Sequence, residues 1–115
     1  MGPMMNEDVK VETKRKRRTD RNHILYLITN NQGDKYVGVT VAVGQAYVRS
    51  VKVRFQKHMS RAKQETNKQW RLYEAIRANP NAGWVATVLE IVRGKAAFQR
   101  EREVIREVGA NLNTF

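Results

Sequence analysis

Glu101 occupies a position that apolar packing alone does not explain. Phe98, Ile105 and Val108 recur at the spacing of one helical face. Glu101 falls on the same stripe, between Phe98 and Ile105. Because an inward-facing carboxylate is costly to bury without a partner, Glu101 needs a cation. The pattern leaves two partners open, a divalent metal ion or an arginine such as Arg54.

Arg54 and His58 lie one turn apart at the edge of the apolar stripe of another expected helix. A guanidinium in that place can grip a phosphate with its forked donors. The alternative is that Arg54 extends its charge to water and that His58 is a partly buried structural histidine. Spacing alone does not decide between these interpretations.

Two tyrosines fall on an expected β-hairpin. Side chains alternate across a strand, so Tyr26 shares a face with Ile24 and Ile28, and Tyr36 shares a face with Gly38. The two tyrosines can therefore lie near each other, beside a glycine that leaves room for a backbone or a ligand. The competing interpretation is that both rings only pack and keep their hydroxyls at the edge.

Hydrophobic patterns and turn residues predict the elements that position these side chains. We expect strands at 24–29 and 35–39 around a turn at 30–34, helices at 45–63, 69–78 and 96–108, and a buried strand at 84–91. The apolar stripes of the first two helices are expected to contain Val48, Val51, Phe55, Met59 and Ala62, and Trp70, Leu72, Tyr73 and Ile76. The segment 111–113 is expected to return to the body of the domain.

The chain is strongly basic, with a formal net charge of +11. Such an excess indicates a partner with phosphates, and a nucleic acid is favoured over a membrane because no basic helix has a broad apolar face. Residues 1–22 are polar and are expected to form a flexible arm ahead of one domain at 23–115. The arm carries a nucleic-acid-binding block, Lys14, Arg15, Lys16, Arg17 and Arg18. Cysteine is absent and no secretion or membrane segment is evident, which favours the cytoplasm, that of the host cell if a phage encodes the chain.

Together these residues resemble the GIY-YIG nuclease superfamily. The resemblance rests on Ile24-Leu25-Tyr26, Tyr36-Val37-Gly38, Arg54-Phe55-Gln56-Lys57-His58, the segments 72–77 and 84–90, Glu101, and Asn113 near the end of the domain. It covers about residues 23 to 115, and the order of the motifs makes it more specific than any one of them. It implies an α/β (α+β) fold with a small central three-stranded antiparallel sheet flanked by helices. Gly38 and Asn113 would have structural roles.

The resemblance also implies metal-dependent hydrolysis of phosphodiester bonds, with Glu101 holding Mg²⁺ or Mn²⁺. Arg54 would offset the charge that builds on the phosphate, and Tyr26 or Tyr36 would take a proton from the attacking water or orient it. A tyrosine starts near a pKa of about 10, so a base role requires help from a nearby cation. Lys35, also a candidate contact to nucleic acid, and His58 could give that help. His58 could instead protonate or position a group.

Two departures from the family pattern stand out. Ile24 replaces the usual glycine of the first motif, a change that leaves strand alternation intact. The segment 39–53 is longer than the family usually has, and we interpret it as an insertion that lengthens the loop and the first helix. It makes Arg49 an alternative to Arg54, although Arg49 lacks the aromatic residue and histidine that follow Arg54.

The expected function is therefore a metal-dependent endonuclease, possessing little more than a catalytic domain and a basic arm. DNA is favoured over RNA as the substrate, and a phage or mobile-element origin of the homing-endonuclease type is suggested by its small size and basic character. The alternative is a non-catalytic basic protein that binds DNA or RNA with the same fold. Strandedness, cleavage sequence and oligomeric state do not follow from the sequence.

Overall fold

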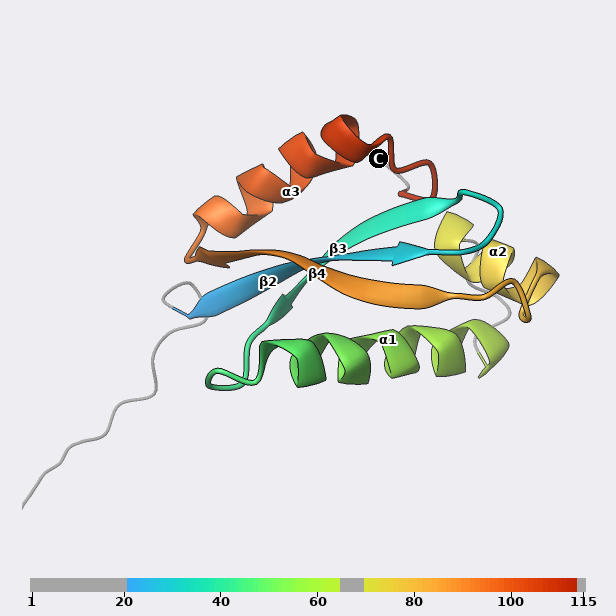
Figure 1. The fold of residues 1–115 in the computed structure, drawn as a ribbon, viewed down its shortest axis with the longest axis horizontal. Helices are drawn as coiled ribbons and strands as arrows, with labels where there is room; N and C mark the ends of the chain where they lie inside the picture. The colour runs from blue at the N-terminus through green and yellow to red at the C-terminus, as the bar shows by residue number, and fades with distance from the viewer. Residues whose placement is uncertain (1–20, 65–69, 114–115) are drawn as a thin grey trace, which may run out of the picture.

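A computed structural model describes residues 21–64 and 70–113, and the basic block at 14–18 lies outside these ranges. The described chain forms an antiparallel sheet of three strands, β2 (Asn22–Thr29), β3 (Lys35–Val41) and β4 (Val85–Arg93), in the order β3-β2-β4. Its helices are α1 (Tyr47–Gln64), α2 (Arg71–Ala78) and α3 (Ala96–Val108). The predicted α+β fold class is confirmed (Figure 1). Within the described ranges no helix is both long and apolar enough to cross a membrane.

The hairpin of β2 and β3 forms because its turn is closed by a side chain. The Asn30 Oδ1 atom accepts hydrogen bonds from the backbone N–H groups of Gln32 and Asp34, each at 3.0 Å. Gly33 supplies the positive φ of 85° that the turn requires. The resulting register pairs Tyr26 with Gly38. This register brings the two motif strands together as the sequence predicts.

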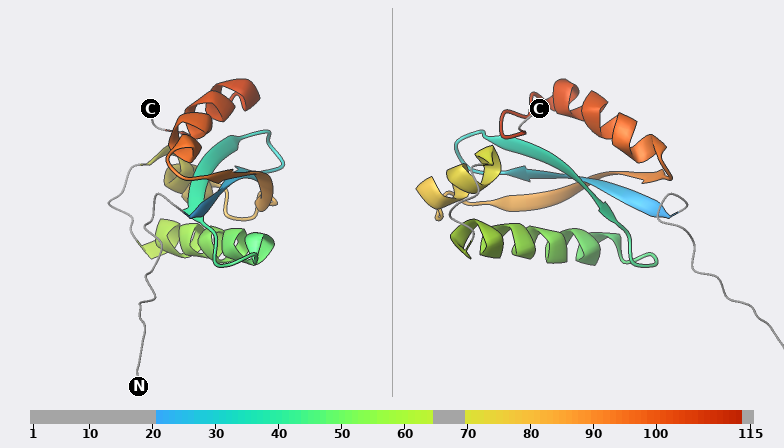
Figure 2. Two further views of the ribbon diagram at one scale, coloured as in Figure 1. Left: turned by 90° about the vertical axis from the view of Figure 1, so that its left-hand side faces the viewer. Right: turned by 180° about the vertical axis from the view of Figure 1, so that it is seen from behind.

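The helices cover the two faces of the sheet separately, as the three views show (Figures 1 and 2). One face packs against α1 and α2, and the other packs against α3. Tyr26, Ile24 and Ile28 join the first core together with residues of α1 and α2. Leu25 and Val37 join the second core with residues of α3. Alternation along β2 therefore divides its side chains between two small cores.

The segment 111–113 runs along the outer edge of β3. The Leu112 N–H group donates to the Lys35 carbonyl at 2.9 Å. The Asn113 side chain accepts from the Val37 N–H group at 3.0 Å and donates to the Val37 carbonyl at 2.8 Å. The prediction that this segment returns to the body is confirmed, and the structure gives Asn113 a structural contact.

Three predicted core residues are instead partly exposed: Val48 by 76%, Phe98 by 47% and Trp70 by 45%. In α1 the buried stripe starts at Tyr47, which lies four positions before Val51. In α3 it starts at Ala97, which lies four positions before Glu101. Only the start of each stripe is thus displaced by one residue, because the other predicted apolar residues of α1 and α3 pack in the two cores as expected.

Two further predictions need correction at the second helix and the third strand. Trp70 precedes α2, and its ring lies 5.1 Å from that of Tyr73 instead of filling the core. The strand β4 is not fully buried, because it is an edge strand whose alternate side chains face outward. The Val85 side chain, for example, is half exposed.

Candidate active site

A buried pair, Tyr26 of β2 and His58 of α1, forms the centre of the candidate site. The Tyr26 Oη atom lies 2.8 Å from His58 Nε2, within hydrogen-bond distance. Only 1% of each residue is exposed. The pairing requires α1 to lie over the face of the sheet that carries Tyr26, which the apolar stripe of α1 enforces.

Gly38 permits this arrangement. It lies opposite Tyr26 in the hairpin, and a Cβ atom at this position would overlap the Tyr26 phenol. The room that the sequence predicts beside Gly38 is therefore taken by Tyr26 itself. Its structural role is to let the Tyr26 ring cross β3 and reach His58.

Tyr36 completes a compact aromatic cluster. Its ring centroid lies 6.4 Å from that of Tyr26 and 5.6 Å from that of His58. Burial raises the pKa of Tyr36, and the Glu101 carboxylate raises it further. Burial is also the largest cause that raises the pKa of Tyr26. Both phenols are consequently neutral at physiological pH, and neither has the lowered pKa of a ready base.

His58 is also neutral. Burial, followed by the positive charges of Arg54 and Arg61, lowers its pKa from 6.5 to about 4. A neutral imidazole has one donor and one acceptor nitrogen, so only one ring nitrogen can accept a proton. The other ring nitrogen, Nδ1, lies 3.4 Å from the Tyr73 hydroxyl. Sequence reasoning assigned Tyr73 to the core alone and gave no sign of this polar contact.

Arg54 reaches the same cluster from α1. Its guanidinium acts on Tyr26 and lowers the pKa of that tyrosine, a weaker effect than the opposing one of burial. The predicted alternative, that Arg54 only extends its charge to water, does not account for this effect. Arg49, the other alternative, is not among the described residues that shift the pKa of Tyr26.

Glu101 approaches from α3, on the other side of the sheet. Burial raises its pKa, and its charge raises the pKa values of both Tyr26 and Tyr36. No residue in the described ranges forms an ion pair or a hydrogen bond with its carboxylate. The internal bridge to Arg54, one of the two expected partners, is therefore absent there. Five predicted site residues thus converge from β2, β3, α1 and α3.

The half-buried carboxylate of Glu101 fits a divalent cation in one respect. Mg²⁺ is commonly held by one or two carboxylates together with waters and substrate phosphates, rather than by a cage of protein ligands. The described residues contain no group of three His, Cys, Asp or Glu side chains suited to a metal. Glu101 is the described residue that would hold such an ion, together with water and substrate.

Lys35 does not join the cluster. Its ammonium group donates to the Val108 carbonyl, at the end of α3, at 3.1 Å. Because side chains alternate along β3, Lys35 and Tyr36 point to opposite faces of the sheet. The structure therefore gives Lys35 a contact that stabilises the end of a helix, and it does not bring Lys35 to the tyrosines as expected.

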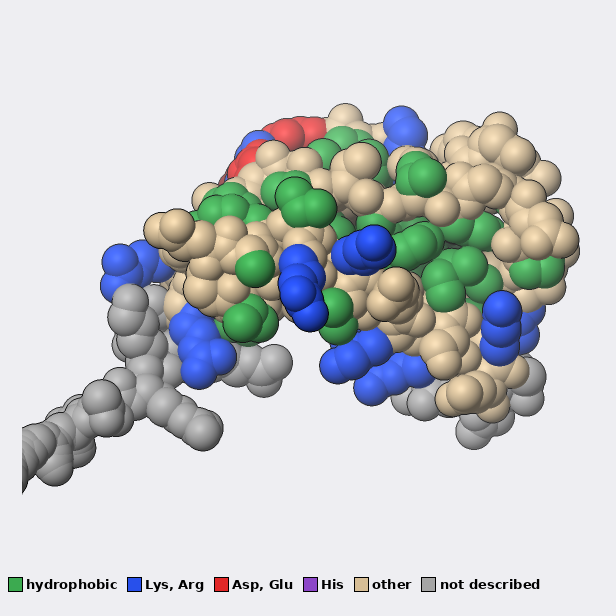
Figure 3. Space-filling view, turned by 60° about the horizontal axis from the view of Figure 1, so that its bottom comes forward, with side chains coloured by type: hydrophobic (Ala, Val, Ile, Leu, Met, Phe, Trp, Pro, Cys, Tyr) green, Lys and Arg blue, Asp and Glu red, His purple; other side chains and the backbone are tan. Residues whose placement is uncertain are grey.

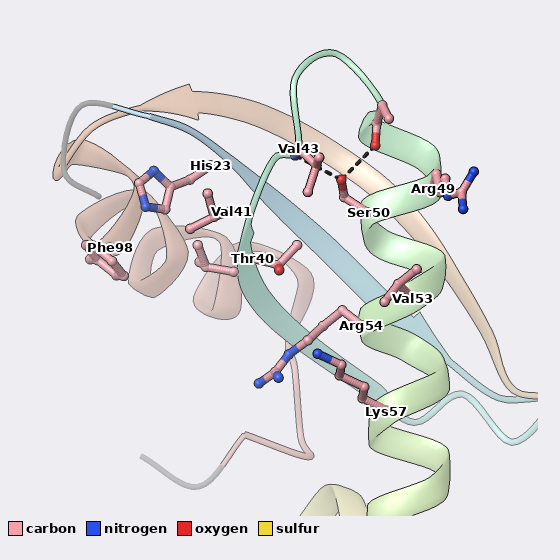
Figure 4. A pocket seen from close by; sticks show the side chains of 12 residues that line it. His23, Thr40, Val41, Val43, Arg49, Ser50, Val53, Arg54, Lys57 and Phe98 are labelled. Atoms are coloured by element: carbon pink, nitrogen blue, oxygen red, sulfur yellow. Dashed lines mark hydrogen bonds between the residues drawn. The ribbon is translucent and has the colours of Figure 1, made fainter. Parts of the chain in front are cut away.

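A groove of about 600 Å³ adjoins the cluster and includes Arg54 in its wall. It lies between α1 and β3 and extends to the first turn of α3. Figure 4 shows Arg54 and Lys57 extending side by side from α1, while His23 and Phe98 lie at the α3 end. Sequence reasoning did not identify this groove, because its walls come from four separate elements.

The surface over α1 is basic. Figure 3 shows Lys and Arg side chains spread over this side of the molecule, with hydrophobic patches between them and acidic groups confined to the far edge. The helix contributes six of these cations and no acidic residue: Arg49, Lys52, Arg54, Lys57, Arg61 and Lys63. Such a surface attracts phosphates.

Comparison of the chain with protein-family models, with curated proteins and with solved structures gave no match.

Proposed function

We propose that this protein is a metal-dependent endonuclease that hydrolyses phosphodiester bonds, with DNA favoured over RNA. The observation that carries the proposal is the convergence of Tyr26, Tyr36, Arg54 and His58 beside the carboxylate of Glu101, which pairs with no described residue. Residues of these types in one place can move a proton, balance phosphate charge and hold a cation. The likeness to the GIY-YIG superfamily in the sequence adds support.

Tyr26 and His58 form a two-step proton path in this proposal. Tyr26 accepts a proton from the attacking water at Oη while it passes its own hydroxyl proton to His58 Nε2. The neutral state of His58 leaves a nitrogen free to accept that proton. A tyrosine with a raised pKa can take part because it never has to exist as an isolated phenolate.

The water oxygen then attacks phosphorus, and the bond from phosphorus to the leaving oxygen breaks. Arg54 balances the negative charge on the phosphoryl oxygens. Tyr36 donates a hydrogen bond that orients the water or a phosphoryl oxygen. Glu101 is the residue that would hold Mg²⁺ or Mn²⁺, and the bound ion would polarise the scissile phosphate and stabilise the leaving oxygen.

The experiment is a cleavage assay with Mg²⁺ or Mn²⁺ on plasmid DNA, single-stranded DNA and RNA. Wild type is compared with Glu101→Gln and Arg54→Ala, and Val85→Ala, at an exposed position of β4, serves as the control. We expect wild type and Val85→Ala to cleave, and the two site variants to bind without cleaving. Cleavage that survives Glu101→Gln would remove Glu101 from the metal site.

A second candidate is a non-catalytic protein that binds nucleic acid. The basic surface of α1 favours it, because that surface explains binding without any chemistry. Binding alone does not explain why Glu101, which pairs with no described residue, is half-buried. We therefore place this candidate second. Tight binding of DNA or RNA by wild type, with no cleavage in either metal, would favour this candidate over the nuclease.

A further inference from the structure

The groove between α1 and β3 contains more than the proposed catalysis requires. Its cations are Arg49, Arg54 and Lys57, and no acidic side chain from residues 21–64 or 70–113 lines it. Arg54 belongs both to the groove and to the cluster around Tyr26. A phosphate chain that reaches Arg54 can therefore continue past Lys57 without meeting a negative charge.

The rest of the lining is mainly apolar. It is formed by Val39, Val41, Val43, Ala46, Val53 and Phe98. The hydroxyl of Ser50 is already used, because it donates to the Ala46 carbonyl at 2.7 Å and accepts from the Val43 N–H group at 3.2 Å (Figure 4). The groove thus offers cations and apolar surface but few free groups that could read base edges.

Phe98 lies at one end of the groove, where its partly exposed ring packs against the buried His23. Its ring is 47% exposed and meets the His23 ring edge-on at a centroid distance of 5.4 Å. His23 is itself buried, and its Nδ1 atom lies 2.9 Å from the Arg21 carbonyl, a contact in which the ring nitrogen donates. Phe98 is the only aromatic side chain among the described residues that is both largely exposed and part of this groove.

We propose that this groove binds an unpaired strand of nucleic acid next to the cleaved bond, with a base stacked on Phe98. Cations would hold the phosphates, and the apolar wall would contact base faces, the combination typical of single-strand binders. In a duplex these faces are already stacked on neighbouring pairs and cannot reach an apolar groove. The position beside the cleaved bond rests on the proposed function, whereas the binding itself does not.

The extent of the groove suits a short stretch of one strand. From Arg49 to Lys57 the helix axis rises by roughly 12 Å, at about 1.5 Å per residue. One strand of B-form DNA carries a phosphate about every 3.4 Å along its axis, and an unpaired strand is more extended. The wall of α1 therefore spans about two to three phosphates of an unpaired strand.

The test measures binding of the full chain by fluorescence anisotropy in EDTA, so that no cleavage occurs. The probes are labelled oligomers of about 12 nucleotides, as single-stranded DNA, single-stranded RNA and a hairpin duplex. The variants are Phe98→Ala, Phe98→Trp and, as a matched control on β4, the exposed Val85→Ala. The two single-stranded probes show whether deoxyribose or ribose is preferred.

We expect Phe98→Ala to weaken single-strand binding by about fivefold or more and to change duplex binding by less than about twofold. Phe98→Trp should keep single-strand binding, because a larger ring still stacks, and Val85→Ala should match wild type. Equal loss on the duplex and the single strand, or no loss on either, would overturn the proposal.

Analytical sedimentation of wild type and Phe98→Ala tests whether the groove instead binds a second copy of the chain. A wild-type dimer that dissociates on Phe98→Ala would assign the groove to a second copy of the chain and overturn the proposal. The result is also separable from the nuclease proposal. Selective loss of single-strand binding in a protein that never cleaves would leave the groove assignment standing while the nuclease proposal fails.

Discussion

Helix α1 carries six lysines and arginines and no acidic residue, whereas α3 alternates three arginines with three glutamates. In α3 two of the three glutamates are paired within the fold. Arg100 alone forms ion pairs with Glu90 at 2.7 Å and with Glu103 and Glu107 at 2.9 Å each. No ion pair in the described ranges involves a cation of α1. One helix therefore leaves its charge available to a partner, and the other uses its charge internally.

Glu101 is the one glutamate of α3 that forms no ion pair within the described ranges, and its charge acts on Tyr26 and Tyr36. Glu103 and Glu107 both pair with Arg100, so their charge is balanced within the fold. Glu101 pairs with no described residue, and burial raises its pKa. The two helices thus differ in how their charge is used, and Glu101 is the glutamate of α3 on which the proposed function rests.

Glu101→Gln against Glu103→Gln gives the largest expected effect. Loss of the proposed metal ligand should lower the single-turnover cleavage rate by about 10³-fold, while Glu103→Gln should stay within about twofold of wild type. The thermal midpoint of Glu101→Gln should not fall. A carboxyl whose pKa is raised on folding stabilises less once it is ionised, so its removal at neutral pH costs no stability. Equal cleavage rates for the two variants would contradict the proposal that Glu101, unlike Glu103, holds the metal ion.

His58→Gln tests whether the buried, neutral His58 of α1 makes the stability of the protein depend on pH. The unfolded histidine takes up a proton near pH 6.5, but the folded one does so only near a pH of about 4. Stability from this residue is therefore present above pH 6.5 and is lost as the pH falls toward 4. Wild type should lose up to about 3 kcal/mol of its free energy of unfolding over that range from this group. Urea titrations of wild type and His58→Gln across this range give the difference, and identical pH profiles would contradict the burial of a neutral His58.

Asn113→Ala tests β3, the strand that carries residues of both faces. It removes two buried hydrogen bonds to Val37 and should lower the free energy of unfolding by about 2 kcal/mol. Asn111→Ala is the control, because its two bonds, to the Lys35 N–H group and to the Asp34 carboxylate, are exposed and together should cost less, about 1 kcal/mol. Chemical denaturation measures both. A larger loss at Asn111 would mean that Asn113 is not the main anchor of β3.

Lys57→Gln against Arg100→Gln gives the smallest effect and compares the two helices directly. If Lys57 contacts a phosphate, its loss should lower the slope of log affinity against log salt by about one. Arg100→Gln should leave the slope unchanged, because its charge is already balanced by three carboxylates. Nucleic-acid titrations at several salt concentrations provide the slopes. A lower slope for Arg100→Gln would show that α3 also faces the nucleic acid.

Local pattern was sufficient to predict the elements and the faces on which several candidate site residues lie. Alternation located the hairpin with Tyr26 and Tyr36, and helical spacing located Arg54 and His58 on one face of α1. The bounds of α3, 96–108, agree with those predicted. Such features depend on neighbours within a few residues, which a sequence displays directly.

Contacts between distant segments could not be predicted in the same way. Apolar spacing allowed a stripe to start at Val48 or at Tyr47, and only the docked sheet decides which of them is buried. The bond from Lys35 to Val108 spans 73 positions and has no local signature. The open edge of β4 follows from the strand order, which a run of apolar residues does not encode.

The anchoring of β3 by residue 113 also has a consequence for the order of folding. Tyr36 lies in the first third of the chain, but the bonds that hold its strand on the outer edge come from residues 76 positions later. Contacts between such distant positions form late, because a long loop must close first. During synthesis the contact between Tyr26 and His58 can therefore form before the chain is complete, whereas the outer edge of β3, the strand that carries Tyr36, is bonded only after Asn113 has been added. A chain that ends before Asn113 would therefore contain every candidate site residue, but Tyr36 would lie on a strand whose outer edge is not yet bonded.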